Sequence, residues 1–425
     1  MRILIVSAYF PPQNSIASLR PYSWAKWWSQ AGHRVTVVTT EKKRGSSDLN
    51  LNISGFEVIS LPVPFSSRST SYFQSNIMNK NNKKYNNLFL SVIRKWYSSF
   101  SQKTGCFYTC RFPDLHDLWT KNAIRKISAR YFDLMITTGG PYSVHRVGLA
   151  IKQKNPLTKW IIDWRDLWTY NHLFKGMKIF LFYERYLENK FHRSADLITT
   201  VSEPLADTLS SITKTQVEVI FNGYDSDDYS EITKKDRKNN EVFTIIYTGT
   251  VYKEYQDPSS LFEAISNLKK NNIITTNNLK IMFAGTTDVR EVAEYYQVPE
   301  FYSYLGFLSR ENALQLQYDA DVVLFLEYNN PSVPGILTGK LFEYIYISRE
   351  IMAIGINETT SAGRLINDTR AGYCFGNDIM EIEKYLCSRV VDKIGNNLEK
   401  NKEYIQKFER KMQAKKILDI MKKYN

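Results

Sequence analysis

Short apolar runs alternate with longer stretches of helical periodicity along most of this chain. Strands of a parallel sheet are buried on both faces and read as continuous apolar runs, and crossover helices cover those faces. The alternation therefore predicts doubly wound parallel sheets. In residues 1–200 we expect strands at Arg2–Ser7, Arg34–Thr40, Glu57–Leu61, Leu134–Thr138, Trp160–Asp163 and Leu197–Val201, with helices at Ser18–Ala31, Trp119–Ala129, Val144–Gln153 and Ile179–Ser194.

The same pattern returns in residues 205–400, and a chain of 425 residues is too long for one ordinary core. We predict an α/β protein with two tandem Rossmann-like domains, over residues 1–203 and 204–400. The tail, 401–425, reads as one basic amphipathic helix that packs back on the first domain. The strands expected in the second half are Val217–Ile220, Phe243–Tyr247, Lys280–Ala284, Asp321–Leu326, Ile351–Ala353 and Ala371–Phe375, and the helices are Pro258–Lys270, Arg290–Tyr296, Glu311–Tyr318 and Gly339–Ile347.

Composition points to a cytoplasmic globular protein. Hydrophobic residues make up 43% of the chain, yet no apolar run approaches the ~18 residues that span a bilayer. The four cysteines, Cys106, Cys110, Cys374 and Cys387, form no CxxC pair and no Cys/His cluster with zinc spacing. We expect reduced structural thiols, no metal site and no cofactor.

The net charge of +13 is concentrated in one window, residues 58–113. This window has no acidic residue and eight basic ones, interleaved with aromatic residues. Such a composition suits peripheral contact with an anionic membrane, here the inner face of the cell membrane. It is equally typical of a solvated loop and helix in a lysine-rich protein. No helix-turn-helix, zinc-finger or RRM pattern accompanies the charge, so we expect no nucleic-acid partner.

The stretch from Gly339 to Tyr344 predicts a phosphate site. It follows an apolar run and a Pro/Gly loop and precedes a second apolar run, which reads as strand, loop, helix and strand. Lys340 and Glu343 then lie in the first turns of a helix that begins at the carboxyl end of a parallel strand. Free N–H groups at such a helix start bind phosphate, and a carboxylate one turn further in accepts hydrogen bonds from a ribose diol.

Ligands of open α/β sheets bind beyond the carboxyl ends of the strands. Other strand ends in the second half are therefore further candidates for the nucleotide site, although each is a weaker signal. Gly249 and Thr250 end one strand, and Lys253 follows them. Gly285 ends the next strand in the same way. Either turn alone also fits a plain connection between strand and helix. Phe307 and Leu308 are candidates to wall a nucleobase, or else belong to the core.

In the first half, two strand ends carry candidate catalytic groups. His145 follows a Gly-Gly-Pro turn at the start of a helix, although a lone histidine is more often structural. Asp163, Arg165 and Asp166 end another strand, where two carboxylates flank an arginine. Burying them without a function is costly, so we favour a functional role, with Arg165 holding a phosphate or sugar. Asp163 or Asp166 would hold a hydroxyl or fix Arg165, and a structural ion pair is the alternative.

Taken in order, these segments resemble the GT-B glycosyltransferases, specifically the retaining family four. The resemblance covers nearly the whole chain. It rests on Ile3–Ser7 with Tyr9-Phe10-Pro11-Pro12, Ala31-Gly32-His33-Arg34-Val35-Thr36-Val37, Gly140-Pro141-Tyr142-Ser143-Val144-His145, Asp163-Trp164-Arg165-Asp166, Asn222-Gly223-Tyr224-Asp225, Thr248-Gly249 and Gly339-Lys340-Leu341-Phe342-Glu343-Tyr344. Many members of the family build bacterial surface polysaccharides.

The family resemblance implies an enzyme with two facing domains. A nucleotide sugar would bind the second domain, a lipid-linked or glycan acceptor would bind the first, and a cleft would close between them. By position, Glu343 would bind the ribose, Gly249, Lys253 and Lys340 would line the diphosphate, and the amides of Gly335 and Ile336 would approach the sugar. Transfer of the hexosyl group would retain the anomeric configuration without a metal or a covalent enzyme intermediate.

Three positions depart from the family pattern. Gly335 stands where the first glutamate of the E-x7-E spacing is usual, Thr250 where an arginine is usual, and Pro11–Ser15 replaces a Gly-Gly loop. Two other functions therefore stay open. One is a UDP-sugar epimerase of the same fold, which would need acid/base carboxylates. The other is a non-catalytic partner protein in a polysaccharide complex, which would fold normally and bind no nucleotide sugar.

Overall fold

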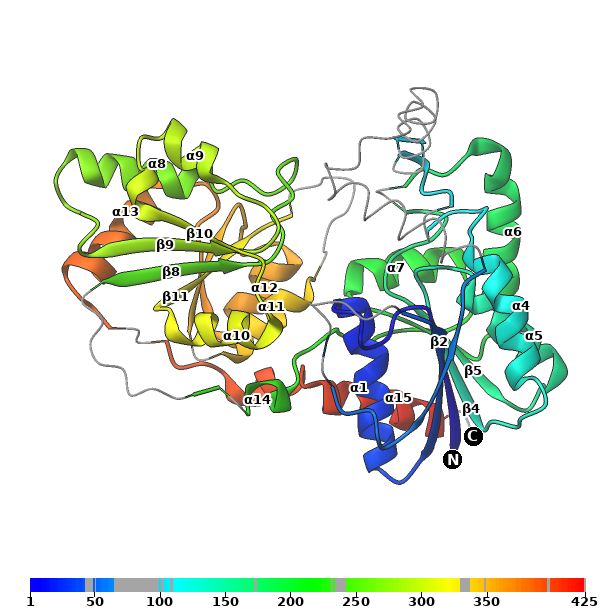
Figure 1. The fold of residues 1–425 in the computed structure, drawn as a ribbon. Coiled ribbons are helices and arrows are strands. Elements are labelled where there is room, and N and C mark those ends of the chain that lie inside the picture. The colour runs from blue at the N-terminus through cyan, green and yellow to red at the C-terminus, as the bar shows by residue number, and fades with distance from the viewer. Residues whose placement is uncertain are drawn as a thin grey trace, which may run out of the picture. The chain divides into compact units, whose positions relative to one another are not determined.

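The structure is a computed structural model of the 425-residue chain. It describes residues 1–42, 49, 51–64, 99–100, 103–107, 110–171, 174–230, 232–233, 242–328, 337–347, 349–395 and 398–423. The chain divides into two compact units, which Figure 1 shows as ribbons. Unit 1 comprises Met1–Phe221 and Ala414–Asn425, and unit 2 comprises Asn222–Gln413.

Unit 1 contains a seven-stranded sheet in the order β3-β2-β1-β4-β5-β6-β7, and every neighbouring pair is parallel. Val, Ile and Leu dominate the central strands because both faces of the sheet are covered. The strands are β1 (Arg2–Ser7), β2 (Arg34–Thr40), β3 (Glu57–Leu61), β4 (Leu134–Thr138), β5 (Lys159–Trp164), β6 (Leu197–Thr200) and β7 (Val217–Val219).

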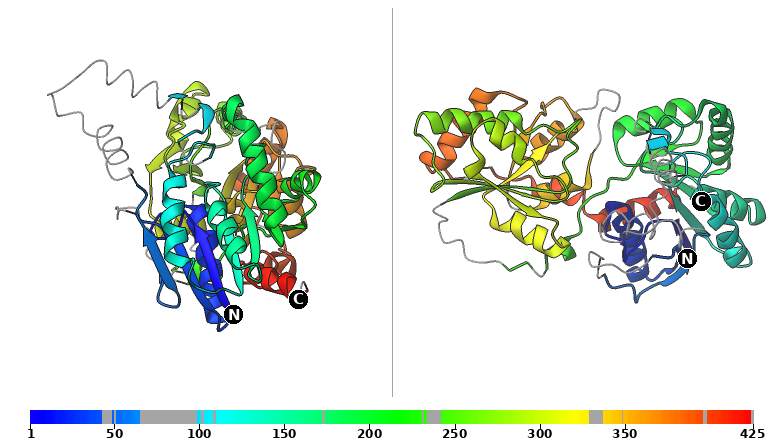
Figure 2. Two further views of the ribbon diagram at one scale, coloured as in Figure 1. Left: turned by 90° about the vertical axis from the view of Figure 1, so that its right-hand side faces the viewer. Right: turned by 45° about the horizontal axis from the view of Figure 1, so that its top comes forward.

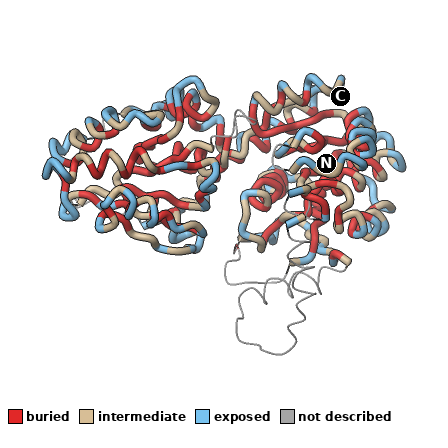
Figure 3. Tube along the Cα trace, turned by 90° about the horizontal axis from the view of Figure 1, so that it is seen from above, coloured by how far each residue is buried: buried red, intermediate tan, exposed pale blue. Residues whose placement is uncertain are grey.

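Helices cover both faces of this sheet. Figure 3 colours the buried residues of the chain red. One face packs Leu4, Met135 and Ile162 against α4, α5 and α6, and the other packs Ile5 and Ile136 against α1. Alternate residues of each strand therefore pack into the hydrophobic cores on opposite faces of the sheet. The helices are α1 (Ile16–Gln30), α4 (His116–Ile127), α5 (Val144–Lys154), α6 (Lys178–Ser194) and α7 (Glu203–Ile212).

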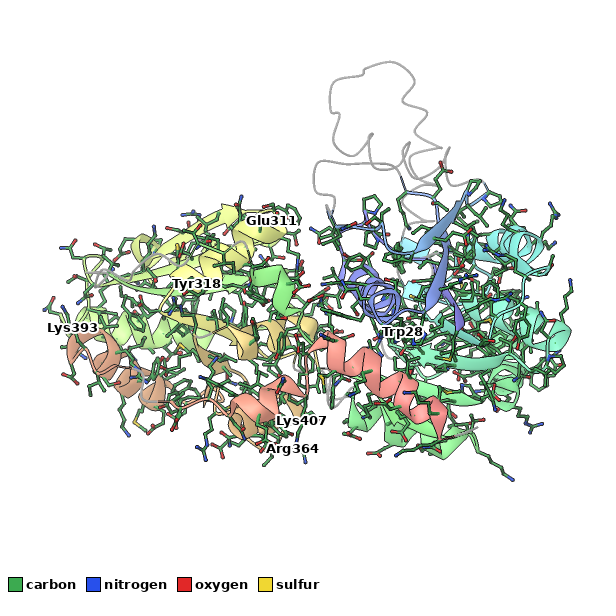
Figure 4. All side chains as sticks on the ribbon, turned by 90° about the horizontal axis from the view of Figure 1, so that it is seen from below. Trp28, Glu311, Tyr318, Arg364, Lys393 and Lys407 are labelled. Atoms are coloured by element: carbon green, nitrogen blue, oxygen red, sulfur yellow. The ribbon has the colours of Figure 1, made fainter. Side chains whose placement is uncertain are left out.

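The tail forms two helices, so the expectation of one continuous helix over Asn401–Tyr424 was wrong. Helix α14 (Lys402–Gln406) ends before a short connection, and α15 (Arg410–Lys422) follows it. The later part of α15 packs on unit 1 beside α1, as Figure 2 also shows. Trp28 of α1, labelled in Figure 4, donates a hydrogen bond from Nε1 to the carbonyl of Ala414 at 3.0 Å.

Strand β7 belongs to the first sheet, which corrects the assignment of Val217–Ile220 to the second domain. It pairs in parallel with β6, and α7 provides the crossover between the two strands. Unit 1 therefore runs on to Phe221, past the domain limit of 203 taken from the sequence. Position 203 lies at the start of α7, which is part of this crossover.

Unit 2 contains a six-stranded parallel sheet in the order β10-β9-β8-β11-β12-β13. The two-sheet α/β fold class is therefore confirmed, although β10 was not predicted. The strands are β8 (Phe243–Thr248), β9 (Leu279–Ala284), β10 (Tyr302–Gly306), β11 (Val322–Leu326), β12 (Glu350–Ile354) and β13 (Gly372–Cys374). The helices are α8 (Ser259–Lys270), α9 (Arg290–Tyr295), α10 (Arg310–Asp319), α11 (Gly339–Tyr346), α12 (Ser361–Thr369) and α13 (Ile379–Leu386).

The parallel arrangement places strand ends of unit 2 at one edge of its sheet. Thr248 at the end of β8 pairs in register with Ala284 at the end of β9. The glycines that follow these two residues are therefore neighbours, although they are far apart in sequence. Within the described ranges, no helix is both long and apolar enough to cross a bilayer.

Candidate functional site

Helix α11 begins at Gly339, as the sequence predicted. Thr338 precedes the helix with extended backbone, and its side chain makes no capping hydrogen bond. The N–H groups of the first turn thus lack the side-chain acceptor that helices commonly place there. A helix start of this kind favours a bound anion.

Lys340 and Gly249 come together beside this helix start. The Lys340 ammonium lies 3.9 Å from the centroid of the Tyr247 ring. A Cβ atom on residue 249 would lie only 2.8 Å from Lys340 Nζ, and Gly249 has a φ of +118°. Burial lowers the pKa of Lys340 to about 7, while the carboxylate of Glu343 acts in the opposite direction. The site therefore holds a desolvated amine that a bound phosphate would favour in its charged form.

The turns after β8 and β9 lie against each other, which explains why both contain glycine. The N–H of Gly249 donates to the carbonyl of Ala284 at 2.7 Å, and the N–H of Gly285 donates to the carbonyl of Gly306 at 2.8 Å. A Cβ atom on residue 285 would lie 2.0 Å from the carbonyl oxygen of Gly249. Only glycine fits this close backbone approach.

Glu343 lies one turn into α11 and is held by an arginine that the sequence analysis did not single out. Arg310 Nη2 donates to Glu343 Oε1 at 2.8 Å and to Asp228 Oδ2 at 2.7 Å. Arg410 Nη1 lies 3.4 Å from the same Asp228 oxygen. The two acids raise the pKa of Arg310, against the opposing effect of burial. The charges of these four residues balance, and one carboxylate oxygen of Glu343, Oε2, is outside this network.

The other residues predicted for this site are mostly at the surface, and two of them lie outside the described residues. Lys253 forms an exposed ion pair with Glu291. Phe307 is 57% exposed, and Leu308 is half-buried. Thr250 Oγ1 is 2.8 Å from Thr286 Oγ1 at the surface. Gly335 and Ile336 lie outside the described residues, as does most of the 58–113 window.

One acidic group near these strand ends was not predicted. Glu327 directly follows β11, and burial raises the pKa of its carboxyl group to about 7. It lines a small cavity of about 290 Å³ together with Lys253 and Gly355. A carboxyl group of this kind can exchange a proton near neutral pH. Its position one residue beyond a strand end is the signal that a sequence search could have used.

In unit 1, His145 is fully buried at the start of α5. Its Nδ1 lies 2.7 Å from Thr137 Oγ1, and its ring packs edge-on against Trp164 with centroids 4.1 Å apart. Burial holds its pKa well below the ordinary value, so the imidazole is neutral. A Cβ atom on Gly139 would lie 2.7 Å from its Nε2, which places the ring directly beneath that turn.

Asp163 is buried in the sheet and pairs with Arg20, whereas the sequence analysis connected it with Arg165. The parallel register places Thr138 and Thr199 on either side of Asp163. Both threonine hydroxyls donate to its carboxylate, at 2.7 and 2.8 Å. Arg20, which the sequence analysis missed, donates from Nε and Nη2 at 3.1 and 2.7 Å. These contacts favour the structural ion pair, which was the alternative to a functional role for Asp163.

Arg165 lies at the same strand end but is held by backbone. It donates from Nε and Nη2 to the carbonyl of Gly139 at 2.8 and 2.6 Å, and from Nη2 to the carbonyl of Gly140 at 3.1 Å. These bonds fix the turn that covers His145. Asp166 is exposed. The four candidates of unit 1 therefore include one exposed acid, one cation that braces a turn, and two fully buried side chains.

Comparison with known sequences gives one domain match. Residues 18–223 match the family described as Glycosyl transferase 4-like domain. This segment corresponds closely to the first part of unit 1. Among curated protein sequences, none matches the chain significantly.

Solved structures share the fold over the whole chain at low identity. A sucrose-phosphate synthase from Thermosynechococcus elongatus is 12% identical with a TM-score of 0.56, over 100% of this chain and 99% of that one. The apo form of a lipopolysaccharide outer core galactosyltransferase is 9% identical with a TM-score of 0.57, over 100% of both chains. A protein described as a UDP-N-acetylglucosamine 2-epimerase from Listeria monocytogenes is 13% identical with a TM-score of 0.51, over 100% of this chain and 96% of that one. At these identities the likeness concerns the fold.

Proposed function

We propose that this chain is a GT-B glycosyltransferase resembling family four, because residues 18–223 match a glycosyl transferase 4-like domain and solved glycosyltransferases share its fold. We further propose that unit 2 binds a nucleoside-diphosphate sugar, with UDP as the first candidate. The single observation that carries the proposal is the grouping of Gly249, Lys340 and Glu343 around the start of α11. The helix start and Lys340 supply positive charge for a diphosphate. Glu343, one turn further in, supplies a carboxylate for the ribose hydroxyls.

The chemistry proposed is transfer with retention at the anomeric carbon, without a covalent enzyme intermediate. The acceptor would attack on the face that the nucleotide leaves. Negative charge then develops on the departing diphosphate, where Lys340 and the amides of α11 would stabilise it. Because these groups supply positive charge where the diphosphate departs, we propose that the reaction is metal-independent.

For the acceptor, we propose a lipid-linked or glycan precursor of a bacterial surface polysaccharide, such as a capsule, O-antigen or exopolysaccharide. Unit 1 would bind it. His145, Asp163, Arg165 and Asp166 stay candidates for this role, with Arg165 and Asp166 the two that are not fully buried. The protein would act in the cytoplasm at the inner face of the membrane, with residues 58–113 as one proposed contact.

The decisive test is calorimetric titration of the full chain with UDP, GDP and a panel of their sugars, with and without EDTA. Tight binding of one nucleotide series, unaffected by EDTA, would support the donor site. Glu343→Ala should weaken binding about tenfold to hundredfold, because hydrogen bonds to a charged group contribute about 1.5–3 kcal/mol. It should also abolish transfer with little loss of fold.

A matched control uses Glu311, which is exposed on the first turn of α10 and labelled in Figure 4. Glu311→Ala removes the same charge from unit 2 and should leave nucleotide binding unchanged. If no nucleotide binds to the wild-type protein, the non-catalytic partner is the better interpretation. If Glu343→Ala binds and turns over like the wild type, the donor site lies elsewhere.

Glu327 favours one alternative, a UDP-sugar epimerase. Such an enzyme needs acid/base carboxyl groups, and burial gives Glu327 a pKa of about 7 at a strand end. The test is incubation with UDP-N-acetylglucosamine alone, followed by separation of products. Epimer formation that is lost in Glu327→Gln would establish this activity, whereas turnover only in the presence of an acceptor would exclude it.

A further inference from the structure

Helix α6 presents a row of apolar side chains to solvent. Ile179 is 76% exposed, Phe182 85% and Tyr186 55%. These residues are spaced three and four apart, so they form one stripe along the helix. Among the described residues, no large hydrophobic side chain is more exposed than Phe182.

The exposed charged residues of α6 are all positive. Lys178, Arg185 and Arg193 are exposed, and Lys190 is half-buried. Both acids of the helix, Glu184 and Glu188, are buried. The outer face of α6 therefore combines apolar groups with cations and carries no carboxylate.

The inner contacts fix the rotation of α6 and prevent the stripe from turning inward. Glu184 accepts hydrogen bonds from Arg111 Nη2 at 2.6 Å and from the N–H of Phe112 at 2.8 Å. Glu188 accepts from the N–H and the hydroxyl of Thr169. Turning the stripe inward would break these buried bonds, and breaking a buried ion pair alone costs about 3–5 kcal/mol.

Tyrosines widen the exposed face on both sides. Tyr183 is 37% exposed, and its hydroxyl accepts a hydrogen bond from Arg146 at 3.0 Å. Tyr170 is 49% exposed, with the Arg185 guanidinium 5.8 Å from its ring centroid. Amphipathic rings of this kind suit a boundary between apolar and aqueous phases.

We propose that the α6 surface, defined as Ile179, Phe182 and Tyr186 with Lys178, Arg185 and Arg193, binds an anionic phospholipid bilayer. The cations contact the headgroups, and the apolar stripe enters the boundary with the acyl chains. A soluble polyanion matches only the charges, because it would leave Ile179 and Phe182 in water. The six residues of this surface lie outside the 58–113 window in sequence, and the proposal does not depend on the donor site.

The test is flotation of the full chain with vesicles of phosphatidylcholine alone or of phosphatidylcholine mixed equally with phosphatidylglycerol. We expect binding to the mixed vesicles only. The pair Ile179→Ser/Phe182→Ser should reduce binding at least about tenfold, since the burial of each apolar side chain is lost. The triple Lys178→Gln/Arg185→Gln/Arg193→Gln should reduce it about a hundredfold, because each cation contributes roughly a factor of five.

Matched controls remove similar groups elsewhere. Leu157→Ser/Tyr295→Ser removes two apolar side chains that are 82% and 79% exposed. Lys270→Gln/Lys280→Gln/Lys393→Gln removes three exposed cations of unit 2, including Lys393, which Figure 4 labels. Both should bind mixed vesicles like the wild type, and circular dichroism should show all four variants folded.

Three results would overturn the proposal. The first is a wild-type chain that does not float with mixed vesicles. The second is α6 variants that float as well as their controls, which would place any membrane contact elsewhere, for example in residues 58–113. If the apolar pair binds normally while the triple variant loses binding both to vesicles and to an oligonucleotide, the face is a general polyanion site. UDP titration of the same variants measures the donor site separately, so failure of one proposal does not affect the other.

Discussion

Arg20 and Asp163, 143 residues apart in the chain, form a bidentate ion pair that is buried in unit 1. The same guanidinium donates from Nη1 to the carbonyls of Ile220 and Phe221, at 2.8 and 3.1 Å. Arg20 therefore connects α1 and β5 to the segment through which the chain leaves unit 1. A role in stability follows directly from this geometry.

Asp163→Asn should lower the free energy of unfolding by about 3 kcal/mol, because it removes the negative charge with which the buried Arg20 forms its ion pair. Urea denaturation measures this change. Asp166→Asn is the matched control: that residue is exposed, and its substitution should change stability by less than about 0.5 kcal/mol. A stable Asp163→Asn protein without transfer activity would instead identify Asp163 as catalytic.

Arg310→Met should destabilise the protein by about 2–3 kcal/mol at pH 7, because Glu343 loses its only ion-pair partner among the described residues. Asp228 keeps Arg410, which limits the loss. Urea denaturation at pH 7 measures this change. Arg290→Met, in an exposed pair with Asp288, should have little effect under the same conditions.

Lys340 should make nucleotide binding depend on pH. With a pKa of about 7 in the free protein, the side chain is neutral at higher pH and must take up a proton to pair with a diphosphate. Affinity should therefore fall as pH rises above 7, by up to about tenfold per pH unit. Calorimetry in buffers of different ionisation enthalpy would detect the proton uptake. Lys340→Met should abolish the uptake, and Lys270→Met should not.

The lowered pKa of Lys340 also makes the free energy of unfolding depend on pH. Between about pH 7 and its ordinary value of 10.5, the unfolded chain binds more protons at Lys340 than the folded chain. Its contribution to the free energy of unfolding therefore rises with pH across this window. A flatter pH dependence in Lys340→Met would agree with this assignment, and an unchanged slope would contradict it.

Gly285→Ala should cost about 3 kcal/mol or more, because the added Cβ would lie 2.0 Å from a backbone oxygen and φ is +155°. Gly306→Ala provides the comparison. That residue also has a positive φ, +70°, but nothing lies within 4 Å of its added Cβ. Its substitution should cost only the backbone strain, about 1 kcal/mol. Equal losses in the two variants would show that close approach is not what requires glycine at position 285.

The fold could be predicted from sequence because its strands are continuous apolar runs and its helices are amphipathic. The first strand, Arg2–Ser7, was predicted with its observed bounds. Strands at the edges of the two sheets were harder to predict from the sequence. Strand β10, Tyr302–Gly306, was missed because its mixed burial pattern gives too little apolar sequence to distinguish it from a loop. A strand was predicted where β7 lies, but a run of only three residues does not show which sheet it joins.

The site could be predicted in part, for a related reason. Glycine and lysine at strand and helix ends are local signals, and the family resemblance implied that Gly249 and Lys340 line one diphosphate site. Arg20 and Arg310 were missed because their partners are far away in the chain. For Arg20 a signal did exist: parallel register places Thr138, Asp163 and Thr199 in one row, and a buried carboxylate there requires a cation.

The chain passes from unit 1 to unit 2 after Phe221 and returns to unit 1 after Gln413. This order has a consequence for biosynthesis. Ala414, Ile417, Leu418 and Met421 complete the core on the α1 face of the first sheet. The ribosome makes these residues only after it has made all of unit 2. Unit 1 therefore emerges first with that face uncovered, and unit 2 has a continuous sequence that can fold while unit 1 waits. During translation, the nascent chain would expose an apolar sheet face that chaperones commonly bind.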